Sequence, residues 1–592
     1  MHVGIVGSGP AAAAVRSALE GRVSTLDPGA VGRTDLAVVL GPVGADGFAR
    51  ANAAARETET PWLAVELGGI GGRPVPDVTA AVSGYAPGRG CFDCLRTRVA
   101  ANGTGEADGD STGGADVSEH EARFAGAVAG REAARLGSGE PSPALGGVIE
   151  VPHARRRFLP VPGCDCGAGP QRDLDPDLDL DPDLERHPDL DRALDRDHTP
   201  RELEAALEAA ERALDPRVGI VSEVGEVESF PVPYYLAHLS DTSGFSDATA
   251  SRAAAGVAAD WNPAFMKALG EALERYAAGV YRTNAFEPAD TEDVPDAVPP
   301  SEFVTPDEWS PDDGPIRWIR GEGLSDGRSV HLPVEFVVFP PPETRHRPSI
   351  TTGLGLGNGG VEALLSGLYE VVERDAAMLA WYSSFEPLGL DVDDDSSRTL
   401  VKRARAKELD ITLLLLTQDV DVPVVAGCVH REGAWPRFAA GMSADLDPAA
   451  AARGALEEAL QNWTELDGMG PEEAAEESGA IGRYADFPEA SREFVSPETA
   501  VPASTVGPTD PPTGEAELDA LVARVTDAGL TPYAARLTPR DLDALGFEAV
   551  RVLMPEAQPL FHDEAYFGER ARRVPRELGF APRLDREHHP FP

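Results

Sequence analysis

The sequence predicts two folded parts of different class, an α/β part at the N-terminus and a larger α+β part after it. In the first part, short apolar segments typical of buried strands alternate with helical segments, and this alternation favours a parallel α/β sheet. In the second part strands and helices are mixed without strict alternation, which favours an α+β fold. An Asp- and Pro-rich stretch separates them. We therefore predict domains at residues 1–170 and 201–592, joined by an acidic, disordered linker at 171–200.

The first part is expected to begin with a strand and an Ala-rich helix that ends near residue 20. Further apolar segments have the length of buried strands and are separated by polar or helical segments. A Gly-, Asp- and Ser-rich segment at 103–114 is predicted to be a mobile loop. The expected strands lie at residues 2–6, 23–26, 36–40 and 62–66.

The turn after the first strand, from Gly7 to Ala12, fits the pattern G-x-G-x-x-A, and Asp27 lies near the end of the next strand. One interpretation is a dinucleotide site, with the pyrophosphate at the helix N-terminus. The other is a tight turn in an α/β domain that binds no nucleotide. Pro10 removes one backbone N–H that would contact phosphate, and this favours the tight turn.

The linker is followed by a helix signal. Residues 173–197 repeat Asp-Leu-Asp and Asp-Pro-Asp units, whose like charges repel and whose prolines oppose helix. Thr199 and Glu202 then form a capping box with Pro200 at the first helical position. This pattern predicts a helix that ends near residue 214.

The composition excludes several classes of function. The 592 residues include 100 Asp and Glu against 52 Lys and Arg, which gives a net charge of −48. This surplus argues against binding to nucleic acid or to an anionic membrane, because both attract basic faces. The sequence contains neither an apolar run of about 18 residues nor a basic signal peptide, so we expect a cytoplasmic protein without a transmembrane helix.

The basic residues are almost all Arg, and the exceptions are Lys267, Lys402 and Lys407. An acid-rich, Lys-poor, Ala-rich chain is typical of the cytoplasmic proteins of halophiles, in which molar salt screens the self-repulsion of the surface. An ordinary acidic protein from a GC-rich genome is the alternative. A hydrophobic fraction of 42% is ample for folded cores in either case.

Four of the five cysteines form two close pairs. Cys91 and Cys94 make a C-x-x-C, and Cys164 and Cys166 make a C-x-C later in the same predicted domain. Four thiolates in two pairs predict a closed, structural Zn²⁺ site in a compartment where disulfides are rare. Unrelated free thiols or a redox pair are the alternatives. Cys428 lies in an apolar run and is predicted to be a buried small residue rather than a nucleophile.

A segment at 264–276 carries more acid than a buried helix usually tolerates. Glu271, Glu274 and Arg275 have the spacing i, i+3 and i+4 and so share one helix face. Their neighbours Leu269 and Leu273 are apolar. The pattern E-x-x-E-R among apolar residues therefore marks this face as a candidate site.

The same pattern recurs at 358–375. At about 100° per residue, Glu362, Ser366 and Glu373 fall within about 40° of one another, with Glu370 at the edge of that stripe. Buried carboxylates need metal ions or Arg partners, and Mg²⁺ prefers carboxylate oxygens while leaving positions for phosphates. Two amphipathic helices with solvated Glu–Arg pairs are the alternative.

These residues carry a resemblance. The segment 271–276 (Glu-Ala-Leu-Glu-Arg-Tyr), with Gly357-Asn358, Glu362 and the segment 370–375, resembles the ATP-binding signature of the YcaO family. The likeness runs from about residue 215 to the last residue. Residues 215–222 resemble the family's opening strand, and residues 550–560 its late segment, where an Arg approaches the nucleotide.

The resemblance implies an ATP- and Mg²⁺-binding YcaO domain. It also implies that the first part is a Rossmann-like, E1-type (ThiF-like) domain with a Cys₄ zinc site, as in the partner proteins of azoline-forming cyclodehydratases. Two positions depart from the family, because Lys267 and Gly355 stand where it often has Ser. The residues implied to bind ATP or Mg²⁺ are Arg217, Ser222, Glu271, Glu274, Arg275, Asn358, Glu362, Ser366, Glu370, Glu373, Arg374 and Arg551.

The last residues, His589-Pro590-Phe591-Pro592, resemble the Pro-rich tail of these cyclodehydratases, where the tail enters the active site. The resemblance implies that the carboxylate of Pro592 acts as a base for the attacking side chain. The alternative is a disordered tail. Many fused members of the family begin with a small winged-helix module that grips the leader peptide, whereas this chain starts directly at the α/β strand, so the resemblance leaves open how a leader would be recognised.

The implied reaction is the ATP-dependent cyclodehydration of Cys, Ser or Thr in a ribosomally made peptide to thiazoline or oxazoline. The implied partners are that precursor peptide, a flavin dehydrogenase that oxidises the product, and a second copy of the chain. Three other interpretations stay open: thioamidation with a sulfur donor, a non-catalytic scaffold that binds peptide and nucleotide, and an oxidoreductase that rests on the turn from Gly7 to Ala12.

Overall fold

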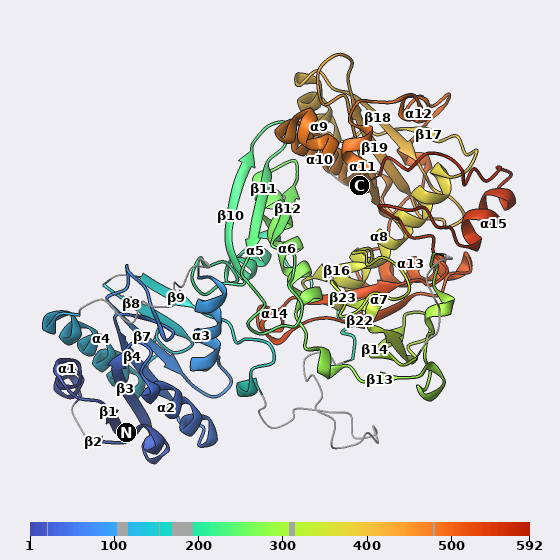
Figure 1. Ribbon diagram of the computed structural model, residues 1–592. Coiled ribbons are helices and arrows are strands. Elements are labelled where there is room, and N and C mark those ends of the chain that lie inside the picture. The colour runs from blue at the N-terminus through green and yellow to red at the C-terminus, as the bar shows by residue number, and fades with distance from the viewer. Residues whose placement is uncertain are drawn as a thin grey trace. The chain divides into compact units, whose positions relative to one another are not determined.

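The computed structural model describes residues 1–19, 22–103, 117–152, 154–167, 193–306, 314–476 and 480–591 (Figure 1). Pro592 and most of both the predicted linker and the predicted loop at 103–114 lie outside the described residues. The chain forms two compact units. The first comprises Met1–Pro188, Arg212–Glu223 and Leu239–Ser246, and the second comprises Asp189–Glu211, Val224–His238 and Asp247–Pro592. Between residues 188 and 247 the chain therefore passes back and forth between the two units.

A seven-stranded sheet in the order β2-β1-β3-β4-β7-β8-β9 forms the centre of the first unit. The four strands at its start are parallel, as the alternation of strands and helices predicted. Each lies within two residues of its predicted bounds. These strands are β1 (His2–Val6), β2 (Arg22–Thr25), β3 (Leu36–Pro42) and β4 (Trp62–Leu67).

The prediction of a wholly parallel sheet is wrong for the rest of it. β7 (Ala80–Tyr85), β8 (Gly147–Val151) and β9 (Ala154–Arg157) are each antiparallel to the preceding strand in the sheet. The chain returns from β4 to β7 through the short ribbon β5–β6 (Gly69–Ile70 and Arg73–Pro74) rather than through a crossover helix. A return without a crossover helix gives antiparallel pairing.

Helices cover both faces of this sheet (Figure 1). α1 (Pro10–Ala18) and α4 (Glu119–Gly137) pack closely on one face, where a Cβ at Gly126 would lie only 2.2 Å from the carbonyl oxygen of Ala11. On the other face, α2 (Asp46–Glu57) and α3 (Phe92–Ala101) pack their aromatic side chains on the sheet. The first unit is thus a three-layer α/β structure.

Three sheets and several long helices make up the second unit, and their mixed order confirms the α+β prediction. The five-stranded sheet has the order β20-β19-β18-β17-β21 and the larger sheet the order β13-β14-β22-β23-β16, with β15 beside β14. Their strands are β13 (Pro288–Ala289), β14 (Ile316–Gly323), β15 (Ser329–Pro333), β16 (Leu354–Gly357), β17 (Leu388–Asp391), β18 (Asp410–Leu415), β19 (Val424–His430), β20 (Phe438–Ala444), β21 (Ala500–Pro502), β22 (Tyr533–Arg536) and β23 (Glu548–Leu553).

A smaller sheet and the helices complete this unit. β10 (Val221–Glu228), β11 (Tyr234–Leu239) and β12 (Ala253–Val257) form the three-stranded sheet. The helix predicted after the linker is α5, which is shorter than expected. The main helices are α5 (Leu203–Glu211), α6 (Trp261–Gly279), α8 (Gly360–Trp381), α9 (Asp395–Ala406), α10 (Pro448–Glu476), α12 (Glu489–Phe494), α13 (Glu515–Asp527) and α15 (Glu569–Glu577). No described helix is both long and apolar enough to cross a bilayer.

Two glycines allow α6 and α8 to lie directly against strands. A Cβ at Gly256 of β12 would lie 2.1 Å from the backbone nitrogen of Ala268 in α6, and a Cβ at Gly355 of β16 would lie 2.1 Å from the carbonyl oxygen of Ala363 in α8. Side chains cannot occupy these positions without moving the helices. The departure from Ser at position 355 is therefore explained by packing.

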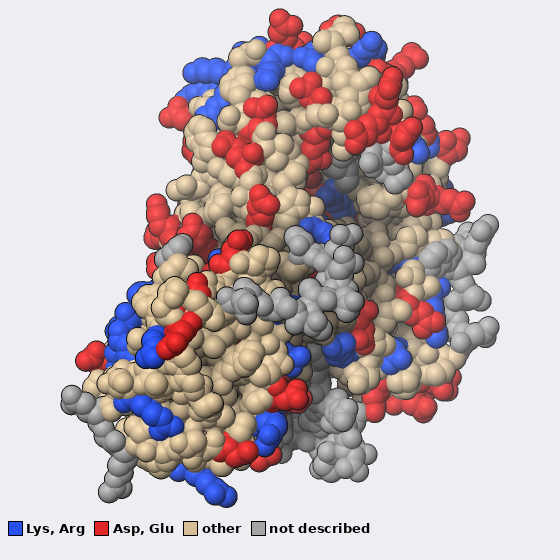
Figure 2. Space-filling view, turned by 60° about the vertical axis from the view of Figure 1, so that its left-hand side comes forward, with Lys and Arg blue, Asp and Glu red and all other residues tan. Residues whose placement is uncertain are grey.

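The acidic composition leads to a test of the halophile interpretation. Asp and Glu side chains spread over much of the face in Figure 2, with basic side chains among them. Because salt screens repulsion between exposed charges, we expect the melting temperature to rise steadily from about 0.1 M KCl into the molar range. Sucrose, which is excluded from protein surfaces but carries no charge, is the control. A melting temperature that responds equally to both solutes would contradict a screening effect.

Candidate functional site

In the first unit, the structure brings the four predicted zinc ligands together. Cys91 and Cys94 lie at the start of α3, and Cys164 and Cys166 lie in a later loop. The sulfur of Cys91 is 3.9 Å from that of Cys94 and 3.7 Å from that of Cys164, and the sulfurs of Cys94 and Cys166 are 3.4 Å apart. All four lie within 4.8 Å of one another. Sulfurs bound tetrahedrally to one Zn²⁺ are roughly 3.8 Å apart, so this geometry suits the ion.

Hydrogen bonds within the cysteine cluster shift the pKa values of its thiols in opposite directions. A hydrogen bond with Cys164 lowers the pKa of Cys91 to about 6, while the pKa of Cys94 is raised by its hydrogen bonds with the other cysteines and by burial. The backbone N–H of Val161 donates to the sulfur of Cys94 over 3.3 Å. Cys428, in contrast, is alone and buried in β19, and burial raises its pKa to about 12. Its thiol is therefore not an activated nucleophile, as predicted.

The glycine turn has a local structural role. Gly7 has φ +113°, and a Cβ there would lie 2.6 Å from the carbonyl oxygen of Leu40. Gly9, also at positive φ, precedes the first residue of α1. Asp27 accepts a hydrogen bond from the backbone of Gly29 and pairs with Arg50 at 2.6 Å. The carboxylate that a dinucleotide ribose would need is thus engaged locally, which favours the tight-turn interpretation.

The second unit contains a cavity of about 380 Å³ between α6 and the segment from β16 to α8. Five of the twelve nucleotide-site residues predicted from the sequence line it. Its lining is Ala255, Met266, Lys267, Gly270, Glu271, Glu274, Leu356, Gly357, Asn358, Glu362, Ser366 and Phe547. A volume of this size is typical of a small-ligand site.

α6 contributes one carboxylate face to the cavity. Glu271 accepts a hydrogen bond of 2.8 Å from the backbone N–H of Ala255 and pairs with Arg275 at 3.3 Å. Burial raises the pKa of Glu274 to about 8, against the opposing effect of Arg275, and Glu370 and Glu271 raise it further. Glu271 and Glu274 thus lie on one face of α6, which lines the cavity, and the raised pKa of Glu274 disfavours its ionisation at neutral pH.

The opposite side of the cavity comes from the start of α8. Glu362 accepts hydrogen bonds from both the backbone N–H and the side-chain amide of Asn358, at 2.7 and 2.9 Å. The other amide atom of Asn358, Oδ1, is buried without a partner among the described residues. One turn later, Ser366 lies on the same face. This arrangement leaves an amide oxygen, a hydroxyl and a carboxylate available to a ligand.

A second group of carboxylates surrounds Arg374 further along α8. The guanidinium of Arg374 lies 3.5 Å from Glu373, 3.9 Å from Glu370 and 4.0 Å from Glu458. Burial raises the pKa of Glu373 to about 8, although Arg374 opposes it, and burial also raises the pKa of Glu458. Glu370 also accepts a hydrogen bond of 2.9 Å from the backbone of Gly353. Three carboxyls thus share a single guanidinium.

The sequence analysis missed Glu458 and its neighbour Glu457, both on α10. Glu458 accepts a hydrogen bond from the backbone N–H of Met442 in β20. Two acidic residues within the apolar stretch from Gly454 to Leu460 were the available signal. They are adjacent in sequence and so do not show the E-x-x-E-R spacing that identified the other two helices.

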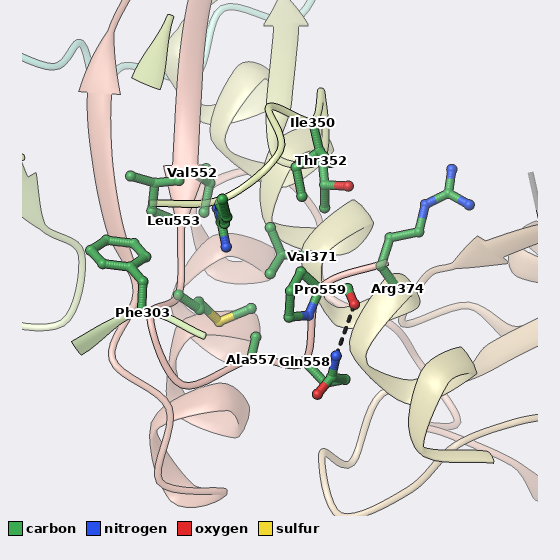
Figure 3. Close-up of a pocket in the computed structure, with 12 residues that line it drawn as sticks. Phe303, Ile350, Thr352, Val371, Arg374, Val552, Leu553, Ala557, Gln558 and Pro559 are labelled. Carbon is green, nitrogen blue, oxygen red and sulfur yellow. Dashed lines mark hydrogen bonds between the residues drawn. The ribbon is translucent and has the colours of Figure 1, made fainter. Parts of the chain in front are cut away.

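Arg374 also lines a small pocket of about 20 Å³, and its guanidinium extends away from the other side chains that line it (Figure 3). Val371 and Thr352 line that pocket, and the side chain of Gln558 donates to the carbonyl oxygen of Pro559 over 3.0 Å. The pocket is too small for a nucleotide, so we place no ligand in it.

Arg551, which the resemblance implies to approach the nucleotide, forms hydrogen bonds with backbone carbonyl groups of the protein itself. It is buried in β23 and donates to the carbonyl oxygens of Ile350 and Thr351 at 2.7 and 2.9 Å. Burial, together with Arg347, lowers the pKa of Arg551 to about 9, although Glu370 and Glu274 raise it. Its electrostatic interaction with Glu274 links it to one of the residues that line the cavity.

Two predicted residues lie in the first unit. Arg217 has a guanidinium nitrogen 3.3 Å from Glu150, and its backbone N–H donates to Asp215 over 2.8 Å. Ser222 lies near the start of β10. The structure therefore brings ten of the twelve predicted nucleotide-site residues into the second unit.

The described end of the chain is packed, not disordered. Phe591 is fully buried in the main core of the second unit, with ring centroids 6.2 Å from Trp381 and 5.9 Å from Phe494. The indole of Trp381 donates to the carbonyl oxygen of Glu587 over 2.9 Å. The alternative of a disordered tail is therefore wrong for the residues up to Phe591, while Pro592 lies outside the described residues.

A histidine cluster precedes Phe591. The ring of His589 donates through Nε2 to the carbonyl oxygen of Phe561 over 2.7 Å. Burial lowers the pKa of His589 to about 3, and the nearby rings of His588 and His562 and the charge of Arg374 lower it further. The charge of Arg374, around which Glu370, Glu373 and Glu458 gather, thus affects the pKa of a residue of the tail.

Comparisons with known proteins show what this chain is similar to. An uncharacterized protein of Methanothermobacter thermautotrophicus is 28% identical over 332 residues, which cover 54% of this chain and 85% of that protein. A heterocyclase solved in complex with substrate and cofactor has a TM-score of 0.72 at 22% identity, covering 98% of this chain and 83% of that one, and so shares its fold.

The carboxylate cavity lies in the region that carries the family match. YcaO from Methanopyrus kandleri, bound with AMPPCP and Mg²⁺, has a TM-score of 0.50 at 26% identity and covers 62% of this chain and 93% of its own. The family model described as YcaO cyclodehydratase, ATP- and Mg²⁺-binding, matches residues 255–558. Because this match spans half of the chain and contains α6, α8 and the cavity between them, the protein belongs to the YcaO cyclodehydratase family.

Proposed function

We propose that the chain is an ATP- and Mg²⁺-dependent cyclodehydratase that converts Cys, Ser or Thr in a ribosomally made peptide to thiazoline or oxazoline. The observation that carries the proposal is the gathering of carboxyls from α6, α8 and α10 around one cavity and one guanidinium. The family match and the related YcaO solved with AMPPCP and Mg²⁺ support it.

The residues present fit a nucleotide with Mg²⁺. Burial raises the pKa values of Glu274 and Glu373 to about 8, so a divalent cation would stabilise the charged forms that burial disfavours. The unpaired Oδ1 of Asn358 is a free acceptor at the same cavity. Magnesium, when bound, supplies neutralisation of the phosphate charge.

We assign distinct roles to the charged residues of the second unit. Glu271, Glu274, Glu362, Glu370 and Glu373 hold the metal, and Asn358 and Ser366 contact the nucleotide. Arg275, Arg374 and Arg551 orient the carboxylates or complement phosphate. The assignment of Arg217 and Ser222 to the nucleotide rests on the family resemblance alone.

The proposed reaction activates a backbone amide. The thiol or hydroxyl of the substrate residue attacks the preceding carbonyl carbon, which forms a C–S or C–O bond and an oxyanion. That oxygen takes the γ-phosphoryl group of ATP and releases ADP. Phosphate then leaves with the former amide oxygen as the C=N bond forms, and the protons of the nucleophile and the amide nitrogen pass to base. We assign the first of these proton transfers to the carboxylate of Pro592.

The test is direct. The protein is incubated with ATP, Mg²⁺ and short Cys-, Ser- and Thr-rich peptides encoded beside its gene, and the peptide mass and phosphate release are followed. We expect loss of one water per ring, with one phosphate released for each. A mass gain that reflects exchange of oxygen for sulfur, when a sulfur donor is present, would replace the proposal with thioamidation. Nucleotide and peptide binding without turnover would replace it with a scaffold role.

We further propose that the first unit is an E1-type, Rossmann-like domain whose four clustered cysteines hold a structural Zn²⁺. A precursor peptide, a flavin dehydrogenase that oxidises the product to an azole, and a second copy of the chain are the partners that fit this reaction. The acidic surface fits a cytoplasm rich in salt, and the melting experiment above tests that part.

The zinc assignment gives a quantitative prediction. We expect about one zinc per chain by elemental analysis, and we expect Cys91→Ser and Cys164→Ser each to lose it, because a closed site needs all four ligands. Cys428→Ser, which changes the one cysteine outside the cluster, should keep the metal. A native protein without metal and with four titratable thiols in the first unit would rule the site out.

A further inference from the structure

Lys267 is a charged residue of the cavity to which the family signature gives no role. It lies on α6 with Gly270, Glu271 and Glu274, and the spacing i, i+3, i+4 and i+7 places all four on the face that lines the cavity. Its side chain is 51% exposed. Among the described residues that line the cavity, Lys267 is the one cation and faces three carboxylates.

The ammonium of Lys267 is held from one side by Glu457. This carboxylate comes from α10, is only 9% exposed, and forms an ion pair with Nζ. Its other oxygen accepts a hydrogen bond of 3.0 Å from the backbone N–H of Ala259. Glu457 is therefore fixed by the backbone, whereas Lys267 keeps two of its three N–H donors for another acceptor.

We propose that Lys267 binds a phosphate group of the nucleotide in this cavity and that Glu457 is a positioning residue that holds the ammonium there. The inference rests on the proposed function, because it takes the cavity ligand to be a nucleotide with Mg²⁺. A Lys ammonium is a compact charge suited to a phosphate oxygen, and a cavity whose other charged lining residues are carboxylates needs such a charge to admit a polyphosphate. The nucleoside part of the ligand gains nothing from this residue.

That difference between phosphate and nucleoside defines the experiment. Binding of AMPPCP with Mg²⁺ and of adenosine is measured by calorimetry at fixed ionic strength for the full chain and for Lys267→Gln, Lys267→Arg and Lys402→Gln. Lys402 is an exposed lysine of α9 and serves as the matched control. We expect Lys267→Gln to weaken AMPPCP binding roughly tenfold and leave adenosine unchanged, since hydrogen bonds to charged groups contribute at that level. The affinity of Lys267→Arg for AMPPCP should stay within about threefold of that of the parent, and the affinity of Lys402→Gln should equal that of the parent.

The role of Glu457 is tested by a double-mutant cycle. Glu457→Gln should weaken AMPPCP binding by several fold in the parent and have no effect in the Lys267→Gln background, because it acts through Lys267. Tighter AMPPCP binding by Glu457→Gln alone would show that Glu457 competes with phosphate and would overturn its positioning role. Thermal melting of each variant shows whether it is folded.

The outcomes separate this inference from the function on which it rests. If the parent binds AMPPCP with Mg²⁺ and Lys267→Gln binds it equally well, the phosphate role of Lys267 is overturned while the proposed function stands. Equal losses for AMPPCP and adenosine would make Lys267 a structural residue and overturn the inference as well. If the parent binds no nucleotide at all, the proposed function itself fails.

Discussion

Replacement of Glu373 by Gln is expected to abolish peptide-dependent ATP hydrolysis while leaving the fold intact. Glu373 shares the guanidinium of Arg374 with Glu370 and Glu458, and removal of its charge would leave too few anionic ligands for Mg²⁺. Because burial raises its pKa to about 8, the nucleotide-free protein holds this carboxyl largely protonated at neutral pH, and Gln is close to that neutral form in shape and charge.

This reasoning also predicts the direction of the stability change. A carboxyl whose pKa is higher in the folded than in the unfolded state costs stability as pH rises from its ordinary value near 4.5 to about 8, because only the unfolded state ionises freely. The free energy of unfolding of Glu373→Gln, measured by denaturant titration, should therefore equal or exceed that of the parent at neutral pH. The difference in free energy of unfolding between Glu373→Gln and the parent should grow as pH approaches 8.

The control for this variant is Glu498→Gln, which removes one charge from an exposed loop of the same unit. It should hydrolyse ATP at the parental rate. If Glu373→Gln also turns over at that rate at matched salt, the carboxylate stripe of α8 has only a structural role and the assignment of the metal site must move.

The sequence was sufficient to locate the carboxylate faces of α6 and α8, because Glu residues that recur every three or four positions among apolar neighbours can lie only on one helix face. It did not show that Glu457 and Glu458 join them. Their contribution depends on the packing of α10 against β19 and β20, which brings residues far apart in sequence together. Adjacent residues on a helix point in different directions, so neither periodicity nor spacing indicated this.

The cysteines and the first sheet show the same difference between features that have a local sequence signal and features that lack one. Two short Cys spacings predicted one cluster although Cys94 and Cys164 are far apart in sequence, because two residues so close along the chain can bring both of their sulfurs to one ion. Strand alternation predicted β1 to β4 correctly. It failed for β7, where the return ribbon β5–β6 replaces a helix, because two-residue strands carry almost no sequence signal.

The burial of Phe591 fixes where the described end of the chain lies and so supports a second strong prediction. With its ring against Trp381 and Phe494, the backbone before it is held by contacts from Tyr484 to His588 and from His589 to Phe561. Pro590 restricts the backbone before Phe591, so holding this segment costs little conformational entropy. The chain up to Phe591 is therefore held firmly in the core of the second unit.

If the carboxylate of Pro592 is the base, addition of a few Gly residues after it should abolish azoline formation, because the charge is displaced while Phe591 stays in its slot. The loss would be measured as disappearance of the water-loss mass shift, with binding of AMPPCP and Mg²⁺ largely kept. The same Gly residues placed before Met1, which is exposed, are the matched control and should change neither property. An extended protein that dehydrates its peptide at the parental rate would show that the tail serves only to close the core around Trp381.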